Sequence, residues 1–462
     1  MAPMPITDAA FLLAERRGQP MHVGGLQLFA LPEGADREFL VDLYRQSVDV
    51  EPQDVHPLFT RRAHRPLSAL GQWSWTHDDD VDLEHHVRHS ALPAPGRVRE
   101  LLQLASRLHQ TPLDRNRPLW EGHLIEGLEG NRFAVYTKFH HALIDGVSGL
   151  RLLQDCLTED PDRTDVPPPW AMPVRGRKER SATAVLPTPG GVVEGARLVV
   201  TNLAETVKAV GVTVQEALRD QASGLATQAP KTMLNVGITG SRRFAAQSYP
   251  IDRIKQVGKA AGATLNDVVL AMSAGALRAY LDEQGALPDV PLIAMVPVSL
   301  RSSEAARDAG NAVGLILCEL ATDEADAGER LRRIVASSTA AKDRMKALGA
   351  TQNMALAGLS VAPRFLTSSL LGDSNPLRPA FNVIVSNVPG PQSPLYWNGA
   401  QLQGIYPLSI PTEGQALNIT CTSYVDHLEF GLTGCRQRVP HLQRLLGQLD
   451  ESLDELVVAT GV

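Results

Sequence analysis

The sequence predicts two α/β domains, each a mixed β-sheet flanked by helices. Three observations support this fold class. The chain has 462 residues, more than one hydrophobic core usually organises, so we expect two domains of roughly 200 residues each. With 44% hydrophobic and 21% charged residues, the composition is that of an ordinary globular protein. Segments with a helical period alternate with β-branched and aromatic segments in both halves of the chain.

The first half contains predicted helices and strands in alternation. Apolar residues at helical spacing predict helices at residues 7–17, 40–48, 98–108 and 147–157. Thr7-Asp8 would cap the first of them. β-branched and aromatic residues indicate strands at 22–29, where two glycines suggest a bulge, and at 132–139. Another strand begins at Trp120, which we expect to be a core residue because a Trp in this position is usually buried.

Residues 160–180 are dense in proline and charged residues, a composition that does not pack as a regular element and indicates a linker. The predicted organisation is an N-terminal domain at 1–165, a linker with a bridging helix at 166–239, and a C-terminal domain at 240–462. For the C-terminal domain the pattern predicts a helix at 267–281 and strands at 292–298, 313–320, 382–386, 416–424 and 428–434.

Charge and cysteine content exclude several classes of protein. The chain carries 44 Lys and Arg against 51 Asp and Glu, a formal charge of -7, which argues against nucleic acid as the main partner. Its four cysteines lie far apart without a C-x-x-C pair, so we expect neither a zinc knuckle nor a disulfide framework, and a reducing cytoplasm fits best.

Two features bear on export and membrane insertion. An acidic residue precedes the first apolar stretch and Arg16-Arg17 follow it, the reverse of the charge order in a secretion signal. The uncharged run of most interest for membrane insertion, 347–363, is too short and too rich in glycine to span a bilayer. We therefore expect a soluble or, at most, surface-associated protein.

Residues 139–146, with the sequence FHHALIDG, lie where a predicted strand ends and a predicted helix begins. At such an edge, functional side chains are held by rigid elements on both sides. A histidine there can act as a general base, because its ordinary pKa lies near neutrality.

On the residues alone, other interpretations of this segment stay open. His140 and His141 could be structural histidines, and Asp145 could simply cap the helix that follows. The three could also bind a metal. The other histidines, such as His123 and His427, form no partner motif for such a site, so we expect no metal.

The segment resembles the HHxxxDG signature of the bacterial wax ester synthase/diacylglycerol acyltransferase family. That family belongs to the CoA-dependent acyltransferases with a chloramphenicol acetyltransferase-like fold. Other segments resemble further blocks of the family, in the same order. They are residues 7–9, 20–24, 118–120, 240–244, 266–267, 296–301, 310–311 and 386–391. The resemblance covers most of the chain from Asp8 onward and leaves out the linker from Trp170 to about Pro230.

The resemblance implies two chloramphenicol acetyltransferase-like domains with the active-site channel between them. It implies that a long-chain acyl group moves from acyl-CoA to diacylglycerol or a long-chain fatty alcohol, giving triacylglycerol and wax esters, without a cofactor. His141 would be the general base that takes the proton of the acceptor hydroxyl as its oxygen attacks the thioester carbonyl. His140 lies in the same neighbourhood, but only one of two adjacent histidines can face the channel.

Other residues receive roles from the same resemblance. Asp145 would orient the turn through an arginine, for which we select Arg301. Asn266, in the family's Asn-Asp segment, would stabilise the transition state or shape the pocket, and a helix N-cap is its alternative role. Arg242 and Arg243 could meet the phosphates of CoA or could be a solvated pair.

The implied partners are acyl-CoA, diacylglycerol or fatty alcohol, and the surface of a membrane or lipid droplet. We therefore expect a cytoplasmic protein attached peripherally to the inner membrane or to lipid inclusions. The apolar segment 354–371 could line a channel, lie in a membrane interface or belong to the core. Two other functions stay open: acyl transfer from a carrier-protein thioester, as in condensation domains, and non-catalytic lipid carriage.

Overall fold

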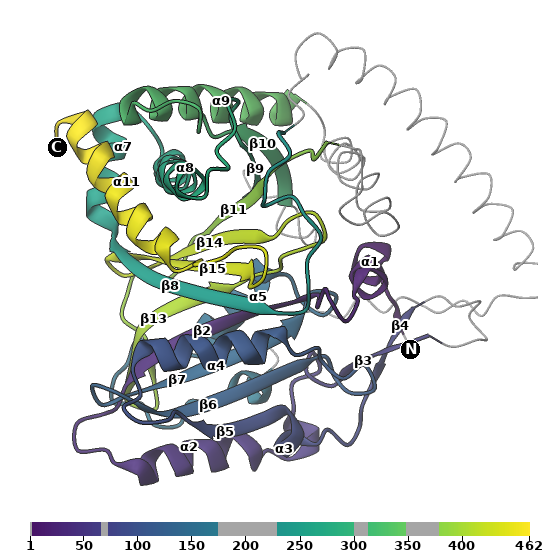
Figure 1. Cartoon of the computed structure of the whole chain (residues 1–462). Helices are drawn as coiled ribbons and strands as arrows, with labels where there is room; N and C mark the ends of the chain where they lie inside the picture. Colours follow the sequence, from purple (N-terminus) through teal and green to yellow (C-terminus); the bar gives the residue numbers. More distant parts are fainter. Residues whose placement is uncertain (1, 66–72, 174–228, 300–312, 348–377) are drawn as a thin grey trace, which may run out of the picture.

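The computed structural model describes residues 2–65, 73–173, 229–299, 313–347 and 378–462. Within these ranges two six-stranded sheets lie one above the other, and helices pack against both of them (Figure 1). Both sheets are mixed, as predicted. The predicted bridging helix, Arg301 and the apolar segment 354–371 lie outside the described residues.

The first sheet has the strand order β12-β13-β2-β7-β6-β5. In chain order its strands are β2 (His22–Ala30), β5 (Val87–Ala91), β6 (Trp120–Leu128), β7 (Arg132–His140), β12 (Tyr396–Trp397) and β13 (Ala400–Leu408). Its helices are α2 (Arg37–Val48), α3 (Leu83–His86), α4 (Val98–Gln110) and α5 (Gly146–Asp155). β5 runs parallel to β6, and the other pairs are antiparallel.

The second sheet has the order β10-β9-β11-β14-β15-β8. Its strands are β8 (Arg242–Pro250), β9 (Ile293–Ser299), β10 (Val313–Glu319), β11 (Val383–Val388), β14 (Leu417–Tyr424) and β15 (His427–Cys435). Its helices are α7 (Ile251–Ala261), α8 (Leu265–Glu283), α9 (Ala327–Ala347) and α11 (Arg444–Thr460). α8 is apolar on nearly all sides and is accordingly buried among the other helices and β11.

A small sheet lies beside the first large one, in the order β1-β4-β3. Its strands are β1 (Ala2–Pro3), β3 (Arg61–His64) and β4 (Ser74–His77). Helix α1 (Ile6–Ala14) follows β1, and the short 3-10 helices η1 (Pro52–Asp54) and η3 (Pro169–Ala171) complete this half. In Figure 1, α1 lies at the right-hand end of the junction between the two large sheets.

Strand β13 joins the two halves of the molecule. It comes late in the chain, yet it pairs with β2, so Gln401 lies opposite Ala30. It also packs closely on β15: a Cβ on Gly431 would lie 2.0 Å from the carbonyl oxygen of Pro407. The domain boundary at 240 stays a prediction, but sheet membership does not follow it, because β12 and β13 complete the sheet of the N-terminal half.

Local structure agrees with the sequence in most places and departs from it in three. The predicted strands and helices in the described ranges are present. However, α1 begins after Pro5 with no side-chain cap, so Thr7-Asp8 does not cap it. Gly24 and Gly25 pair with β7 in unbroken register; the bulge lies in β13, at Gln403. The pattern also left several elements unpredicted, among them β5, β8, β13, α7 and α9.

Two global features concern the cysteines and the helices. The four cysteines are free and buried. Among the described helices, none is by itself long and apolar enough to cross a membrane; α7 and α8 pass such a test only as a pair, across a bend of 103°.

Candidate functional site

The HHxxxDG segment is held from both sides where β7 ends. The backbone N–H of His140 donates to the carbonyl of Leu119, ahead of β6, at 2.9 Å. The N–H of His141 donates to the carbonyl of Met21, ahead of β2, at 2.8 Å. Hydrogen bonds to the segments ahead of β6 and β2 therefore hold His140 and His141 on both sides. The turn that follows, called the histidine turn below, starts from a fixed position.

His140 is the inward-facing member of the pair. Its side chain is fully buried, and Nδ1 accepts a hydrogen bond from the backbone N–H of Ala142 at 3.1 Å. Its Nε2 lies 3.4 Å from Oε1 of Glu15. Burial alone would raise the pKa of Glu15, but its interactions with His140, the Met21 N–H and Arg115 lower that pKa to about 2.

His141 has a different environment, because the strand has ended and its side chain is only partly buried. Its ring stacks on the ring of Phe11 from α1, with centroids 4.1 Å apart and planes inclined by 17°. Burial lowers its pKa to about 4, against opposing contributions from its own backbone carbonyl and from Asp145, while the charge of His140 lowers it further. At neutral pH the imidazole is therefore uncharged and able to accept a proton.

Asp145 is the N-cap of α5, as one of the alternatives anticipated. Its Oδ1 accepts hydrogen bonds from the N–H groups of Val147 and Ser148, both at 3.0 Å. Its Oδ2 accepts from the Ser148 hydroxyl at 2.6 Å. The carboxylate thus begins the helix directly after the histidine turn. Its expected partner, Arg301, lies outside the described residues.

Asn266 lies on the second residue of α8 and is partly buried. The N-cap is Thr264, which forms a capping box with Asp267. The alternative role of Asn266 as N-cap is therefore wrong. Within the described residues, Asn266 forms no hydrogen bond with His140 or His141. By contrast, His140, His141 and Asp145 lie close together in the short segment where β7 ends and α5 begins.

The predictions for Arg242 were both wrong. Its side chain is buried and donates to the carbonyls of Thr239, Ser241 at 3.3 Å and Gly18 at 3.1 Å. Burial lowers its pKa to about 10. It is therefore neither solvated nor free to meet a phosphate, and it ties the start of β8 to the segment ahead of β2.

Trp120 is a core residue, as predicted. Its side chain is fully buried, and its indole N–H donates to the Phe59 carbonyl at 2.8 Å. The ring stacks on Trp170, with centroids 5.1 Å apart. It supports the start of β6, where Trp120 pairs with Phe139 at the end of β7.

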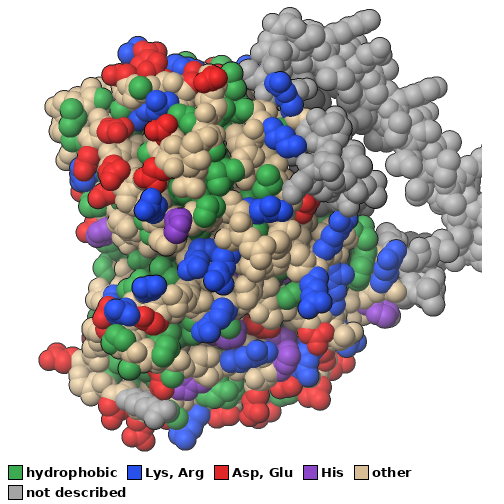
Figure 2. Space-filling model, in the orientation of Figure 1, with side chains coloured by type: hydrophobic (Ala, Val, Ile, Leu, Met, Phe, Trp, Pro, Cys, Tyr) green, Lys and Arg blue, Asp and Glu red, His purple; other side chains and the backbone are tan. Residues whose placement is uncertain are grey.

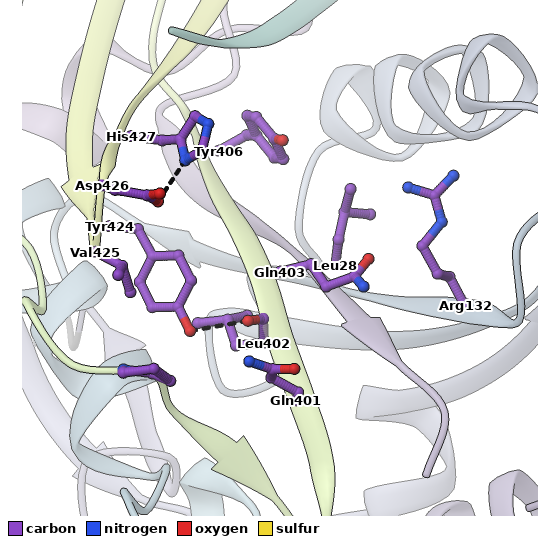
Figure 3. Close-up of a pocket in the computed structure, with 11 residues that line it drawn as sticks. Leu28, Arg132, Gln401, Leu402, Gln403, Tyr406, Tyr424, Val425, Asp426 and His427 are labelled. Carbon is purple, nitrogen blue, oxygen red and sulfur yellow. Dashed lines mark hydrogen bonds and ion pairs between the residues drawn. The ribbon is translucent and has the colours of Figure 1, made fainter. Parts of the chain in front are cut away.

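A pocket of about 450 Å³ opens elsewhere, between β2, β13 and the β14–β15 turn (Figure 3). Leu28, Tyr406 and His427 are among the residues that line it. Nδ1 of His427 lies 2.6 Å from Asp426 Oδ1. The pocket is at the far end of β2 from His22, which pairs with His140, so it is separate from the histidine turn.

Sequence patterns missed two residues of this site, Phe11 and Glu15. Both fall in the helix predicted at 7–17, but α1 ends at Ala14, so Phe11 lies on the helix and Glu15 just beyond it. What they contact is decided by packing between α1 and the end of β7, which no local pattern encodes. In the described ranges, no group of three or more His, Cys, Asp or Glu side chains is arranged to hold a metal ion.

Comparisons with known proteins agree with this architecture. The model of the wax ester synthase/diacylglycerol acyltransferase catalytic domain matches residues 4–269, and that of the family's C-terminal domain matches residues 309–457. A Mycobacterium tuberculosis protein, provisionally named a diacylglycerol O-acyltransferase, is 49% identical over 457 residues, covering 98% of this chain and 99% of its own.

Solved structures show the same relationship. The wax ester synthase/diacylglycerol acyltransferase from Marinobacter aquaeolei VT8 superposes with a TM-score of 0.80 at 44% identity, covering 100% of both chains. The starter condensation domain of rhizomide synthetase superposes with a TM-score of 0.60 over 100% of this chain and 94% of that one; at 12% identity it shows the fold alone. The chain therefore belongs to the wax ester synthase/diacylglycerol acyltransferase family and is an acyltransferase.

Proposed function

We propose that this acyltransferase moves a long-chain acyl group from acyl-CoA to the hydroxyl of diacylglycerol or of a long-chain fatty alcohol, with His141 as the general base. The observation that carries the proposal is the state of His141. Its imidazole is uncharged at neutral pH, half-buried and stacked on Phe11, directly after a strand whose end is hydrogen bonded on both sides. The names of the Mycobacterium and Marinobacter relatives support the choice of acceptors.

The proposed reaction is a single displacement at the thioester. His141 takes the proton of the acceptor hydroxyl while the hydroxyl oxygen forms a bond to the thioester carbonyl carbon. The tetrahedral intermediate collapses, the carbon–sulfur bond breaks, and the CoA thiolate leaves with the bonding electron pair. The proton held by His141 then passes to the thiolate, which restores the base. Positioned proton transfer of this kind typically accelerates a reaction by about 10² to 10⁴.

Asp145 and Asn266 have supporting roles in this proposal. As the N-cap of α5, Asp145 fixes the backbone that follows the histidine turn. Asn266 would present its side-chain amide, with the N-terminus of α8, to the oxyanion of the intermediate or to the pocket wall. Such donors act when they are in place before the reaction.

We propose that acyl-CoA is a substrate and that the reaction needs no metal or other cofactor. The test is treatment with a chelator such as EDTA. We expect unchanged turnover, and inactivation that added divalent cation reverses would contradict the proposal.

We also propose that the protein works in the cytoplasm, attached peripherally to the inner membrane or to lipid inclusions, because its acceptors and products are lipids. The surface distribution of charge supports contact with anionic groups. Although the net charge is -7, Lys and Arg side chains gather in a band across the middle of the face in Figure 2, over the region between the two sheets. Flotation with anionic liposomes tests this, and protein that stays at the bottom of the gradient would refute it.

The activity test uses purified protein, radiolabelled palmitoyl-CoA and two acceptors in parallel, hexadecanol and dioleoylglycerol, with the products separated by chromatography. We expect ester formation with at least one acceptor. His141→Ala should reduce turnover by at least about a hundredfold. A matched control is His427→Ala. This histidine lines the separate pocket near the far end of β2, so its removal should leave turnover unchanged.

Other outcomes would identify other functions. Turnover with an acyl-carrier-protein thioester but none with palmitoyl-CoA would indicate a condensation-domain type of donor. Equal activity of the His141→Ala and His427→Ala proteins would remove His141 from the mechanism. Lipid binding without turnover in any of these assays would indicate a carrier.

A further inference from the structure

We propose that helix α1 and the residue after it position the catalytic base. Phe11 of α1 orients the ring of His141. Glu15, directly after the helix, fixes the backbone of His141 and the side chain of His140. The proposal rests on the role of His141 proposed above. It adds two residues to the working site, neither of which lies in the HHxxxDG segment. Both are positioning residues rather than catalytic residues, because each acts through a histidine.

The first contact is the stack of Phe11 on His141. Phe11 lies on α1, and Glu15 follows the last helical residue, Ala14, in an extended conformation; both side chains contact the end of β7. With centroids 4.1 Å apart and planes inclined by 17°, the phenyl ring covers one face of the imidazole. Rotation of the imidazole about its χ2 angle would break this stack, and water is excluded from the covered face. The ring therefore has one favoured orientation before substrate arrives.

The second contact is a set of interactions made by one carboxylate. Oε1 of Glu15 accepts a hydrogen bond from the backbone N–H of Met21 at 3.1 Å and lies 3.4 Å from His140 Nε2. The carbonyl of the same Met21 accepts from the N–H of His141 at 2.8 Å. Glu15 is thus connected to His140 through its ring and to His141 through the Met21 peptide.

An arginine completes the arrangement around Glu15. Oε2 accepts from Nε of Arg115 at 2.9 Å, and the Arg115 guanidinium also donates to the Leu12 carbonyl of α1 at 2.8 Å. The Glu15 side chain is only 6% exposed. A buried carboxylate with this many donors has little freedom to move, since leaving any donor unpaired would be unfavourable.

The charged and titratable groups around the two histidines come from four separate parts of the chain. Glu15 follows α1, Arg115 lies in the segment between α4 and β6, His22 is on β2, and Asp145 caps α5. The pKa of Glu15 is lowered to about 2, so its carboxylate stays ionised across the working range of pH. The pKa of His22 lies well below the ordinary value, mainly because of burial, so His22 is uncharged there.

The experiment compares Phe11→Leu, Phe11→Tyr and Glu15→Gln with the parent protein in the palmitoyl-CoA assay, from pH 4 to 9. Phe11→Leu keeps an apolar side chain but loses the stack, and Phe11→Tyr keeps the stack. Leu13→Ala is the control, because Leu13 is on the same helix and is 63% exposed. Thermal unfolding of each variant reports whether it is folded.

We expect Phe11→Leu and Glu15→Gln to lower kcat roughly 10- to 100-fold, the size expected when a base is misplaced, with little change in KM. Phe11→Leu should also move the acid limb of kcat/KM to higher pH, because water then reaches the imidazole. Phe11→Tyr and Leu13→Ala should keep the parent's kcat and pH profile. A loss of stability alone would not shift that profile.

The proposal is overturned if Phe11→Leu has the kcat and acid limb of the parent protein. Should Glu15→Gln not fold, Phe11→Leu and Phe11→Tyr still decide the matter. Failure of the positioning role is distinguishable from failure of the proposed function. If His141→Ala is inactive while Phe11→Leu and Glu15→Gln behave as the parent, only the positioning role is wrong; if His141→Ala is active, the base itself is wrong.

Discussion

His140 and His141 are adjacent in the chain but have separate environments because β7 ends between them. The last residue of the strand points into the protein, where His140 has no exposed surface. One residue later the backbone turns, and His141 contacts Phe11 while retaining partial exposure. Burial, the cause that lowers the pKa of His141, also keeps the imidazole in the form a general base requires.

The pH dependence of activity follows from this lowered pKa. A base must be uncharged, so activity is lost when pH falls through the pKa of the group. Because the pKa of His141 is lowered from 6.5 to about 4, we expect kcat/KM to stay level from pH 7 to about 5 and to fall below that. Initial rates between pH 4 and 8 measure this, with circular dichroism recorded at each pH. An acid limb near 6.5 in folded protein would contradict the prediction.

Two helix N-caps allow the role of Asp145 to be separated from simple helix stability. Asp145 begins α5 beside the site, and Asp36 begins α2 by accepting a hydrogen bond from the Glu38 N–H at 2.8 Å. We expect Asp145→Ala and Asp36→Ala each to lower the free energy of unfolding by about 1 to 2 kcal/mol. Only Asp145→Ala should also reduce turnover. Urea unfolding and the acyl-transfer assay measure both effects, and equal activity of the two variants would refute the prediction.

The junction between β13 and β15 depends on a glycine. Since a Cβ on Gly431 would meet the Pro407 carbonyl oxygen at 2.0 Å, we expect Gly431→Ala to force the strands apart and to lower the unfolding free energy by about 1 to 3 kcal/mol or more. Gly447→Ala is the opposite control. Gly447 lies inside α11 with open space around it, so alanine there should raise stability by about 0.5 to 1 kcal/mol.

Urea midpoints of the two glycine variants, compared with the parent protein, check this prediction. A Gly431→Ala protein as stable as the parent would show that β13 can shift away from β15 at little cost.

For the whole molecule, buried histidines should make stability depend on pH. Burial lowers the pKa of His86 to about 4 and that of His109 to about 3. The unfolded chain takes up protons near pH 6.5 and the folded chain does not. Stability should therefore fall as pH drops below 6.5, and a shift of two units corresponds to about 3 kcal/mol for a buried group.

One buried group acts in the opposite sense. Burial raises the pKa of Glu429 to about 7. Its stabilising contribution to the free energy of unfolding is therefore present below pH 4.5 and is lost as pH rises to 7. Because the histidines outnumber it, we expect the urea midpoint at pH 5 to be lower than at pH 7. Glu429→Gln should make the fall steeper, since it removes the opposing contribution. A midpoint at pH 5 equal to or above that at pH 7 would contradict this prediction.

Much of the fold could be predicted because periodicity is local. α8 is apolar on nearly every side, and β10, with the sequence VGLILCE, is an apolar run up to its last residue, so each was visible within a short window. The position of the HHxxxDG segment between a strand and a helix could be predicted for a similar reason. Two predictions were wrong because each depends on particular local contacts. Thr264 rather than Asn266 caps α8. Arg242 is not a solvated side chain, because it is buried with the backbone carbonyls that accept its hydrogen bonds.

By itself, the sequence determined the fold class, many of the helices and strands, and the segment that carries the histidines, because these depend on neighbouring residues along the chain. Only the tertiary structure decided that β13 completes the first sheet and that Phe11 and Glu15 meet the two histidines. Strand pairing across some 370 residues and the packing of α1 on the end of β7 depend on which surfaces bury each other. No local pattern records that choice, since many pairings satisfy the same alternation of apolar residues.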